Sequence, residues 1–283
     1  MLNTFLVFLI RLIPDWLKGK SRIAKILLKN YCSNASDVYI KLASGQSILV
    51  PNVNEPVAFS VLISGVYEPD VLAVIKNNIG QGDIFVDVGA NVGCFSVPLA
   101  KIVGPLGRIH SFEASPFVSS YLKKNIEYNG LANVVFNNFA VSDKVGHVSF
   151  YDAPVNKFGM GGLAPVNLGS PSTKVKSVTL DEYFNPPCKI KVLKIDVEGF
   201  EISVLKGASH LLLNNYVELV IFEFLDWAES RVPACSSGDS QRYLMELGFH
   251  IWILSEYVNG GPPLKVAIET GGEMLVAKKA SDE

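Results

Sequence analysis

A glycine-bearing turn preceded by an aspartate is the first feature of this sequence that could bind a ligand. Residues 85–96 read FVDVGANVGCFS, an apolar run that ends at Val88 and leads into a helical pattern. Gly89 and Gly93 carry no Cβ, so the backbone there can approach a bound molecule closely. The free N–H groups at the helix start attract a negative group, and Asp87 can accept a hydrogen bond from an ammonium group. An amino-acid moiety, which carries both charges, is the expected ligand of this turn.

A glutamate beyond the next apolar run extends the expected ligand to a nucleoside. Glu113 follows Gly93 by twenty residues, and an acidic side chain in that place accepts hydrogen bonds from both ribose hydroxyls. Nicotinamide enzymes favour a G-x-G-x-x-G turn, whereas Asn91 replaces the second glycine here and leaves little room for a pyrophosphate. The combination favours S-adenosylmethionine, and Asn91 joins the residues expected to bind it.

The adenine side of such a site is only weakly marked. Asn138, Ala140 and Ser142 follow the third apolar run. Ligands lie beyond the carboxyl ends of the strands in an open α/β sheet, so these three residues are the nearest candidates.

A second group of carboxylates belongs to the segment KIDVEGFE at 194–201. It ends another apolar run, and so Asp196 and Glu198 are expected in the same cleft as the glycine turn. Period-two alternation lets both side chains point the same way, and Lys194 neutralises part of their charge. One of the two carboxylates can orient or deprotonate an acceptor hydroxyl. Glu68 is a further candidate for this base.

Two alternatives remain for these acids. Asp196 and Glu198 can simply cap the helix that follows, because negative charge is stabilising at a helix N-terminus. Together with Glu223 they also make three carboxylates that could hold a hard cation. Metal sites usually have a clearer set of ligands, so no metal is expected.

Strand and helix patterns alternate along most of the chain, and this alternation must position both groups. Short apolar runs predict strands at 84–88, 108–112, 133–139, 190–195 and 217–224. Helices are predicted at 69–78, 200–205 and 238–247. Regular alternation is typical of an α/β fold with a mostly parallel, twisted sheet and helices on both faces. Near the end, 249–254 and 273–278 predict a closing strand pair.

The segment 152–173 interrupts the alternation with many Gly, Pro, Asn and Ser residues, among them FGMGG at 158–162. Long loops without secondary structure are uncommon in compact domains and often act as lids or binding loops. A surface insertion is the alternative, and the sequence does not decide between the two.

Composition and charge indicate the class of protein. With 283 residues, of which 49% are hydrophobic, the chain is long enough to bury one sizeable core. The formal net charge is only −2, which argues against nucleic acid as a partner, because nucleic-acid binders usually carry a basic excess. The four cysteines form no CxxC pair, so reduced thiols in a cytoplasmic protein are expected.

Residues 1–64 are expected to form an N-terminal helical segment with short strands at 38–42 and 47–51, ahead of a domain at 65–283. Residues 5–10 are apolar throughout, but a bilayer span takes about 20 residues. Because basic residues follow, residues 1–29 could make a weak peripheral contact with a membrane. Packing of this segment on the domain is the simpler alternative.

Several short motifs together resemble the FkbM-type methyltransferases, which use S-adenosylmethionine. The matching segments, in the order of the family, are GVYEP at 65–69, the turn at 87–96, SFEASP at 111–116, AVSD at 140–143, VTLDEY at 178–183, 193–201 with VLKGA at 204–208, and VIFE at 220–223. The resemblance implies a Rossmann-like class I methyltransferase fold with S-adenosylmethionine as methyl donor. It also implies O-methylation, often of sugar or polyketide hydroxyls.

The leading hypothesis is therefore an O-methyltransferase that acts on a small-molecule or glycan hydroxyl. A catalytically silent module would keep Gly89, Gly93 and Glu113, bind S-adenosylmethionine and lack an acceptor pocket. A nicotinamide-dependent oxidoreductase is disfavoured by the sequence of the turn. Consumption of the cofactor distinguishes the first two hypotheses, and competition between the two cofactors tests the third.

Overall fold

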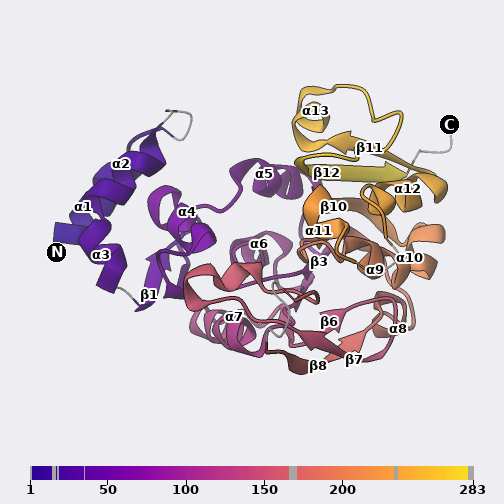
Figure 1. Ribbon diagram of the computed structural model, residues 1–283, viewed down its shortest axis with the longest axis horizontal. Coiled ribbons are helices and arrows are strands. Elements are labelled where there is room, and N and C mark those ends of the chain that lie inside the picture. The colour runs from indigo at the N-terminus through magenta and orange to yellow at the C-terminus, as the bar shows by residue number, and fades with distance from the viewer. Residues whose placement is uncertain are drawn as a thin grey trace.

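A seven-stranded sheet lies at the centre of the chain, in the order β11-β12-β10-β9-β3-β4-β5 (Figure 1). The computed structural model describes residues 2–14, 17, 19–34, 36–165, 171–232 and 235–279. The strands are β3 (Ile84–Val88), β4 (Arg108–Phe112), β5 (Val134–Asn137), β9 (Ile190–Ile195), β10 (Val217–Leu225), β11 (Phe249–Ile253) and β12 (Gly272–Lys279). The first five run parallel, and β12 is antiparallel to β10 and β11. The predicted Rossmann-like sheet with a closing antiparallel pair is confirmed.

Alternation of side chains along the central strands divides the core in two, because successive residues of a strand point to opposite faces. Phe85 and Val192 lie on the face covered by α5 (Pro69–Asn78), α6 (Ser96–Val103), α7 (Pro116–Tyr128) and α13 (Leu254–Asn259). Val86 and Leu193 lie on the face covered by α8 (Leu180–Tyr183), α9 (Glu201–Lys206), α10 (Ser209–Leu213) and α12 (Asp239–Glu246). Helices on both sides explain why these strands are apolar throughout.

The N-terminal part packs against α6 and α7 at the edge of the sheet. It comprises α1 (Leu2–Arg11), α2 (Lys20–Leu27), α3 (Lys29–Asn34), the antiparallel pair β1 (Ser36–Lys41) and β2 (Ser47–Asn52), and α4 (Pro56–Ser64). Both predicted short strands are therefore present, whereas the helical start is divided into separate helices. Leu28 and Val50 share one buried cluster with Val97 and Val118 of the domain.

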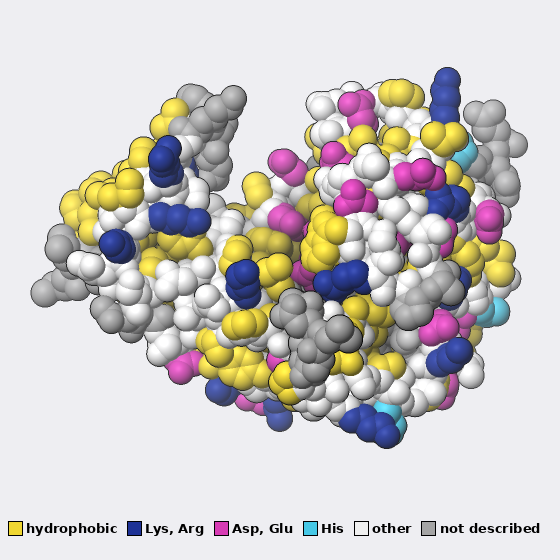
Figure 2. All heavy atoms as spheres, in the orientation of Figure 1, with side chains coloured by type: hydrophobic (Ala, Val, Ile, Leu, Met, Phe, Trp, Pro, Cys, Tyr) yellow, Lys and Arg dark blue, Asp and Glu magenta, His cyan; other side chains and the backbone are white. Residues whose placement is uncertain are grey.

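The outer side of α1 and α2 remains apolar. Phe5, Phe8, Leu12, Ile23 and Ile26 are exposed there, and Figure 2 shows the resulting band of apolar side chains along these helices. Within the described ranges, no single helix is long and apolar enough to cross a membrane. The helices α4 and α5 meet that test only as a pair, bent by 75°.

A small second sheet follows β5 and flanks the loop that was predicted at 152–173. β8 (Thr173–Val178) pairs with β6 (Ala140–Val141) and with β7 (Gly146–Phe150), and a 3-10 helix, η1 (Val155–Met160), follows β7. Residues 166–170 of the predicted loop lie outside the described residues. β5 ends earlier than predicted, at Asn137, and the side-chain Nδ2 of the next residue, Asn138, donates to the carbonyl oxygens of Glu113 (2.8 Å) and Ala114 (3.2 Å).

Asn125 of α7 and Asn129, which caps the C-terminal end of that helix, tie the N-terminal strand pair to the domain. Asn125 is fully buried; its Oδ1 accepts from the N–H of Leu49 (2.6 Å), and its Nδ2 donates to the carbonyl oxygens of Leu49 (3.0 Å) and Val92 (2.8 Å). Asn129, one turn further along and half-buried, exchanges the same two bonds with Ser47. Each side-chain amide therefore makes the two hydrogen bonds that the backbone of a neighbouring strand would make with β2.

Replacing Asn125 by leucine is expected to destabilise the protein by about 3 kcal/mol or more, because each buried group left without a partner costs about 1–3 kcal/mol. The matched variant Asn129→Leu should cost less, since water reaches the half-buried site. Urea unfolding followed by circular dichroism measures both. Equal losses in the two variants would contradict the assigned role of Asn125.

Candidate functional site

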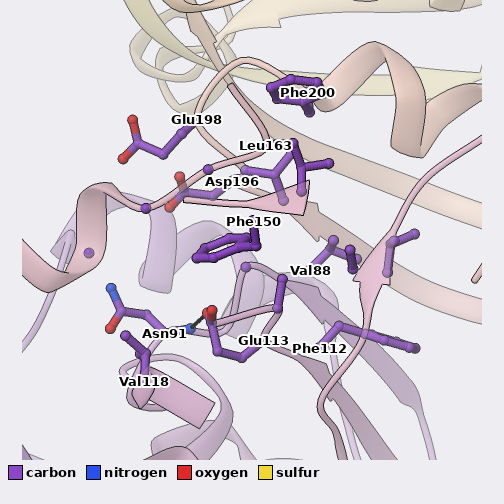
Figure 3. Close-up of a pocket in the computed structure, with 18 of the residues that line it drawn as sticks. Val88, Asn91, Phe112, Glu113, Val118, Phe150, Leu163, Asp196, Glu198 and Phe200 are labelled. Atoms are coloured by element: carbon purple, nitrogen blue, oxygen red, sulfur yellow. Dashed lines mark hydrogen bonds between the residues drawn. The ribbon is translucent and has the colours of Figure 1, made fainter. Parts of the chain in front are cut away.

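A cavity of about 670 Å³, part of it open to solvent, lies at the carboxyl ends of β3, β4 and β9. Its walls come from the turn after β3, the end of β4, the residues after β5, the end of β7, the segment 158–163 and the turn after β9. Figure 3 shows Asn91 and Glu113 on one side of this first cavity and Asp196 and Glu198 on the other.

Glu113 ends β4 and is bound to the glycine turn. Its Oε2 accepts from the N–H of Asn91 and its Oε1 from the N–H of Ser115, each at 2.9 Å. Only 8% of the residue is exposed, and burial raises the pKa of Glu113 to about 7 although the two N–H groups oppose the shift. Each carboxylate oxygen keeps a second lone pair, so the group can still accept hydrogen bonds from a ligand.

The rest of the first cavity is largely apolar. Its apolar lining residues are Val88, Phe112, Ala114, Val118, Phe139, Ala140, Val141, Phe150, Phe158, Leu163, Val197 and Phe200. Of the three residues predicted for the adenine side, Ala140 is among them. Phe150 was missed because it lies beyond the third predicted strand with no local signal for a ligand, whereas Phe158 belongs to the segment 152–173, for which a lid or binding loop was one of the two predictions.

Asn138 and Ser142 do not line this cavity, and the prediction for them needs correction. The Asn138 amide is bound to the backbone after β4, as described above. The Ser142 hydroxyl bonds to Asp143 at 3.1 Å, and its backbone packs against Gly207 at the end of α9. Asn138 therefore supports the wall from behind, and Ser142 belongs to the packing of α9.

The glycine turn has one half in the site and one half in the core. Gly89 and Asn91 line the cavity, and both have positive φ, 79° and 52°. A Cβ on Gly89 would overlap the carbonyl oxygen of Asp196, whereas a Cβ on Gly93 would meet Leu122 Cδ1 at 3.0 Å. Glycine is therefore needed at position 93 for core packing, not for approach to a ligand as predicted.

Asp87 lies beneath the turn and lines no cavity. Its side chain is fully buried, and its Oδ2 accepts from the Ser96 hydroxyl at 2.6 Å. Burial raises the pKa of Asp87, and Lys194 opposes that shift. Its Oδ1 lies 3.9 Å from Lys194 Nζ. This geometry gives Asp87 an internal partner in place of the predicted contact with a ligand's ammonium group.

A second cavity, of about 710 Å³, adjoins the first. It shares Gly89, Asn91, Gly159, Asp196 and Glu198 with the first cavity. Its other lining residues are Glu55, Pro56, Val57, Tyr67, Ala90, Cys94, Phe95, Met160, Lys194 and Glu223. Asp196 and Glu198 therefore face both cavities, as their common position after β9 predicted.

The carboxylates around the second cavity differ in their surroundings. Asp196 accepts from Lys194 Nζ at 3.0 Å and keeps 22% of its side chain exposed. Burial, and then the charge of Asp196, raises the pKa of Glu198 to about 7. The same two causes raise the pKa of Glu223 to about 9. Glu201 accepts from the N–H groups of Val197 and Gly199, at 3.0 and 3.3 Å, and so holds the turn in shape.

Glu68 is close to this group but lines neither cavity. It precedes α5 with φ 40°, and its Oε2 is buried without a hydrogen-bond partner in the part of the chain that the structure describes. Burial raises its pKa, and Lys194 opposes that shift. No group of three His, Cys, Asp or Glu side chains that could hold a metal ion occurs among the described residues.

The segment after β7 lies across the boundary of the two cavities. Phe158 is buried in the same apolar cluster as Leu28 and Val50 of the N-terminal part. A Cβ on Gly159 would lie 2.9 Å from Asn91 Nδ2 and 3.0 Å from Glu55 Oε1. These contacts support the interpretation of residues 155–163 as a cover over the cleft rather than a surface insertion.

Several solved structures resemble this one, at low sequence identity. An rRNA methylase from Streptococcus thermophilus is 12% identical, with a TM-score of 0.43 over 75% of this chain and 95% of that one. A SAM-dependent O-methyltransferase from Thermotoga maritima is 13% identical, with a TM-score of 0.43 over 90% and 82%. A Streptococcus mutans protein in complex with SAH is 10% identical, with a TM-score of 0.43 over 74% and 96%. At these identities the likeness concerns the fold alone.

The expected partners need correction at this point. The sequence analysis excluded nucleic acid on the ground of net charge, but an rRNA methylase is among the proteins of similar fold. The exclusion is therefore withdrawn. Within the described part of residues 1–29 no helix is long enough to cross a membrane, and the expected peripheral contact stays a prediction.

The family comparison covers all the residues that line the first cavity. No curated protein matches the chain. The model of the methyltransferase FkbM domain matches residues 87–251, more than half of the chain. This range begins at Asp87 and includes Glu113, Asp196, Glu198 and Glu223. The chain belongs to the FkbM family of S-adenosylmethionine-dependent methyltransferases.

Proposed function

We propose that this protein transfers the methyl group of S-adenosylmethionine to a hydroxyl group of a sugar- or polyketide-type acceptor. One observation carries the proposal: Glu113 lines one end of the first cavity, and Asp196 and Glu198 line the other. A carboxylate suited to ribose hydroxyls and a pair suited to an acceptor hydroxyl thus share one cleft. A silent binding module has no need of the second pair.

The residues of the first cavity fit a nucleoside. Glu113 has a lone pair left on each oxygen for the two ribose hydroxyls. Phe139, Val141 and Phe150 give the first cavity an apolar surface suited to an adenine ring. Asn91 and Gly89 also line the second cavity, where the amino-acid end would lie. S-Adenosylmethionine supplies a methyl group that its sulfonium already activates, so the protein's main tasks are alignment and exclusion of water.

Glu198 is the proposed base, and Asp196 orients the acceptor. A base works best when its pKa lies near the working pH, and that of Glu198 is about 7. Asp196 is less suited, since one of its oxygens is engaged by Lys194. Burial and the neighbouring carboxylates raise the pKa of Glu223, which favours its protonated form as a hydrogen-bond donor to the acceptor. Glu68 is set aside because it lines neither cavity.

Glu113→Ala should weaken the binding of both S-adenosylmethionine and S-adenosylhomocysteine. Loss of hydrogen bonds to a charged group costs about 1.5–3 kcal/mol, roughly a 10- to 150-fold change in Kd. Titration calorimetry measures the change, with Glu127→Ala, an exposed glutamate of α7, as the control. An unchanged Kd in the Glu113 variant would remove the ribose assignment.

Glu198→Gln should lower kcat by roughly 10²–10⁴-fold, the usual contribution of a general base, while the Kd of the cofactor stays unchanged. In the wild type, kcat should rise with pH through about 7, because the base must lose its proton before it can act. The glutamine variant should lack this rise. Stopped assays from pH 5.5 to 9 measure both, and a wild-type profile in the variant would rule out Glu198.

The acceptor itself requires a screen. Labelled S-adenosylmethionine is incubated with hydroxylated sugars, glycans, polyketide-type alcohols and RNA oligonucleotides, and product masses are recorded. A methylated hydroxyl is the expected product. Transfer to a nitrogen or carbon atom contradicts O-methylation, and binding without transfer to any member favours the silent module.

A further inference from the structure

Lys194 is a lysine in the middle of the sheet, where a charged side chain is rare. Its side chain is 1% exposed, although it lies two residues before Asp196 in β9. In the parallel pairing of β3 and β9 it stands opposite Asp87. Alternation along β9 puts it on the same face as Val192, toward α5 and α6, and there it reaches the second cavity.

Lys194 lies between Asp87, beneath the glycine turn, and Asp196, which faces the proposed acceptor. Its Nζ donates to Asp196 Oδ2 at 3.0 Å and lies 3.9 Å from Asp87 Oδ1. The ring of Phe95 covers the ammonium group, with its centroid at 5.0 Å from Nζ. Asp196 therefore has one oxygen held from within the protein and the other left for the cleft.

Acidic groups surround this ammonium from every neighbouring element. Asp87 faces it from β3, Glu68 from the start of α5, Asp196 from the turn after β9 and Glu223 from β10. Tyr67 and Cys94 complete the surroundings of the ammonium group. Burial is the largest cause of the raised pKa of each. Among the described residues that line the second cavity, Lys194 alone carries a positive charge.

A buried ion pair of this kind is weak evidence for a purely stabilising role. The cost of taking both charges out of water usually offsets their attraction, and apolar replacements are often neutral. What the pair provides here is a carboxylate in a fixed orientation at the cleft, with its negative charge partly balanced.

We propose that Lys194 is a positioning residue that holds the Asp196 carboxylate in a fixed orientation beside Glu198 and partly balances its charge, so that Glu198 remains the group that exchanges the proton. The inference rests on the proposed function, in which Asp196 orients the acceptor and Glu198 is the base. It adds that the balance of charge between the two carboxylates depends on a third residue, within the sheet.

Loss of the ammonium group can be observed without an acceptor. Besides burial, the charges that act on Glu198 are those of Asp196 and Glu55, which raise its pKa, and that of Arg231, which lowers it. Without Lys194 the charge of Asp196 is no longer partly balanced, so the pKa of Glu198 should rise above about 7. An opposite charge within about 4–6 Å shifts a carboxyl pKa by about 1–3 units. Because Lys194 contacts Asp196 and acts on Glu198 through it, an upward shift at the low end of that range is expected.

The experiment is a ¹³C NMR titration of side-chain carboxyls in the ligand-free protein, with the Glu198 signal assigned by its loss in Glu198→Gln. The variants are Lys194→Met and Lys194→Gln, which remove the charge, and Lys194→Arg, which keeps it. Lys191→Met is the matched control, because Lys191 lies in the same strand and pairs with the half-exposed Glu218 away from the cleft. Circular dichroism establishes which variants fold.

The Glu198 titration should move to higher pH in a folded neutral variant and stay in place in Lys194→Arg and Lys191→Met. A folded neutral variant with an unchanged titration overturns the inference. Asp196→Asn supplies a test that keeps Lys194 in place: removing the charge of Asp196 should lower the pKa of Glu198, and no change there also overturns it. Absence of methyl transfer by the wild type bears on the proposed function alone, since the titration uses no acceptor.

Discussion

The contact between the ends of β3 and β9 is the constraint on which the site depends. At Gly89 the backbone of the turn lies against the carbonyl oxygen of Asp196, at a spacing that no Cβ permits. The N–H of Asp196 in turn donates to the carbonyl oxygen of Val88 at 3.0 Å. Backbone contacts thus fix the glycine turn relative to the carboxylate pair, so the side chains around the cleft do not have to hold the two strand ends together.

Burial sets the character of the acids that this contact brings together. Removal of water disfavours a charged carboxylate, so the pKa values of Glu113, Glu198 and Glu223 all rise, to about 7, 7 and 9. They differ because Glu113 receives two backbone N–H groups, whereas Glu223 faces other carboxylates. Pairs of acids whose surroundings separate their pKa values are typical of sites that move protons.

The second cavity draws on parts of the chain that the sequence separates. Glu55, 1% exposed, caps α4 through the N–H of Ala58 at 2.8 Å and faces Gly159 of the covering segment. Asn91 of the turn meets the same glycine. Elements on both sides of the domain boundary predicted at residue 64 therefore line the same cavity.

The sequence by itself determined β3, β4, β9 and the edge at which Glu113, Asp196 and Glu198 meet. Apolar runs and glycine turns are local signals, and parallel strands bring their carboxyl ends to one side. It did not determine that Gly93 and Asp87 face inward, that Ser142 packs on α9, or that Phe150 and Glu55 line the cavities. Those outcomes depend on how elements distant in sequence pack, because a cavity wall is formed by whichever side chains the neighbouring elements leave uncovered, and no local pattern records that.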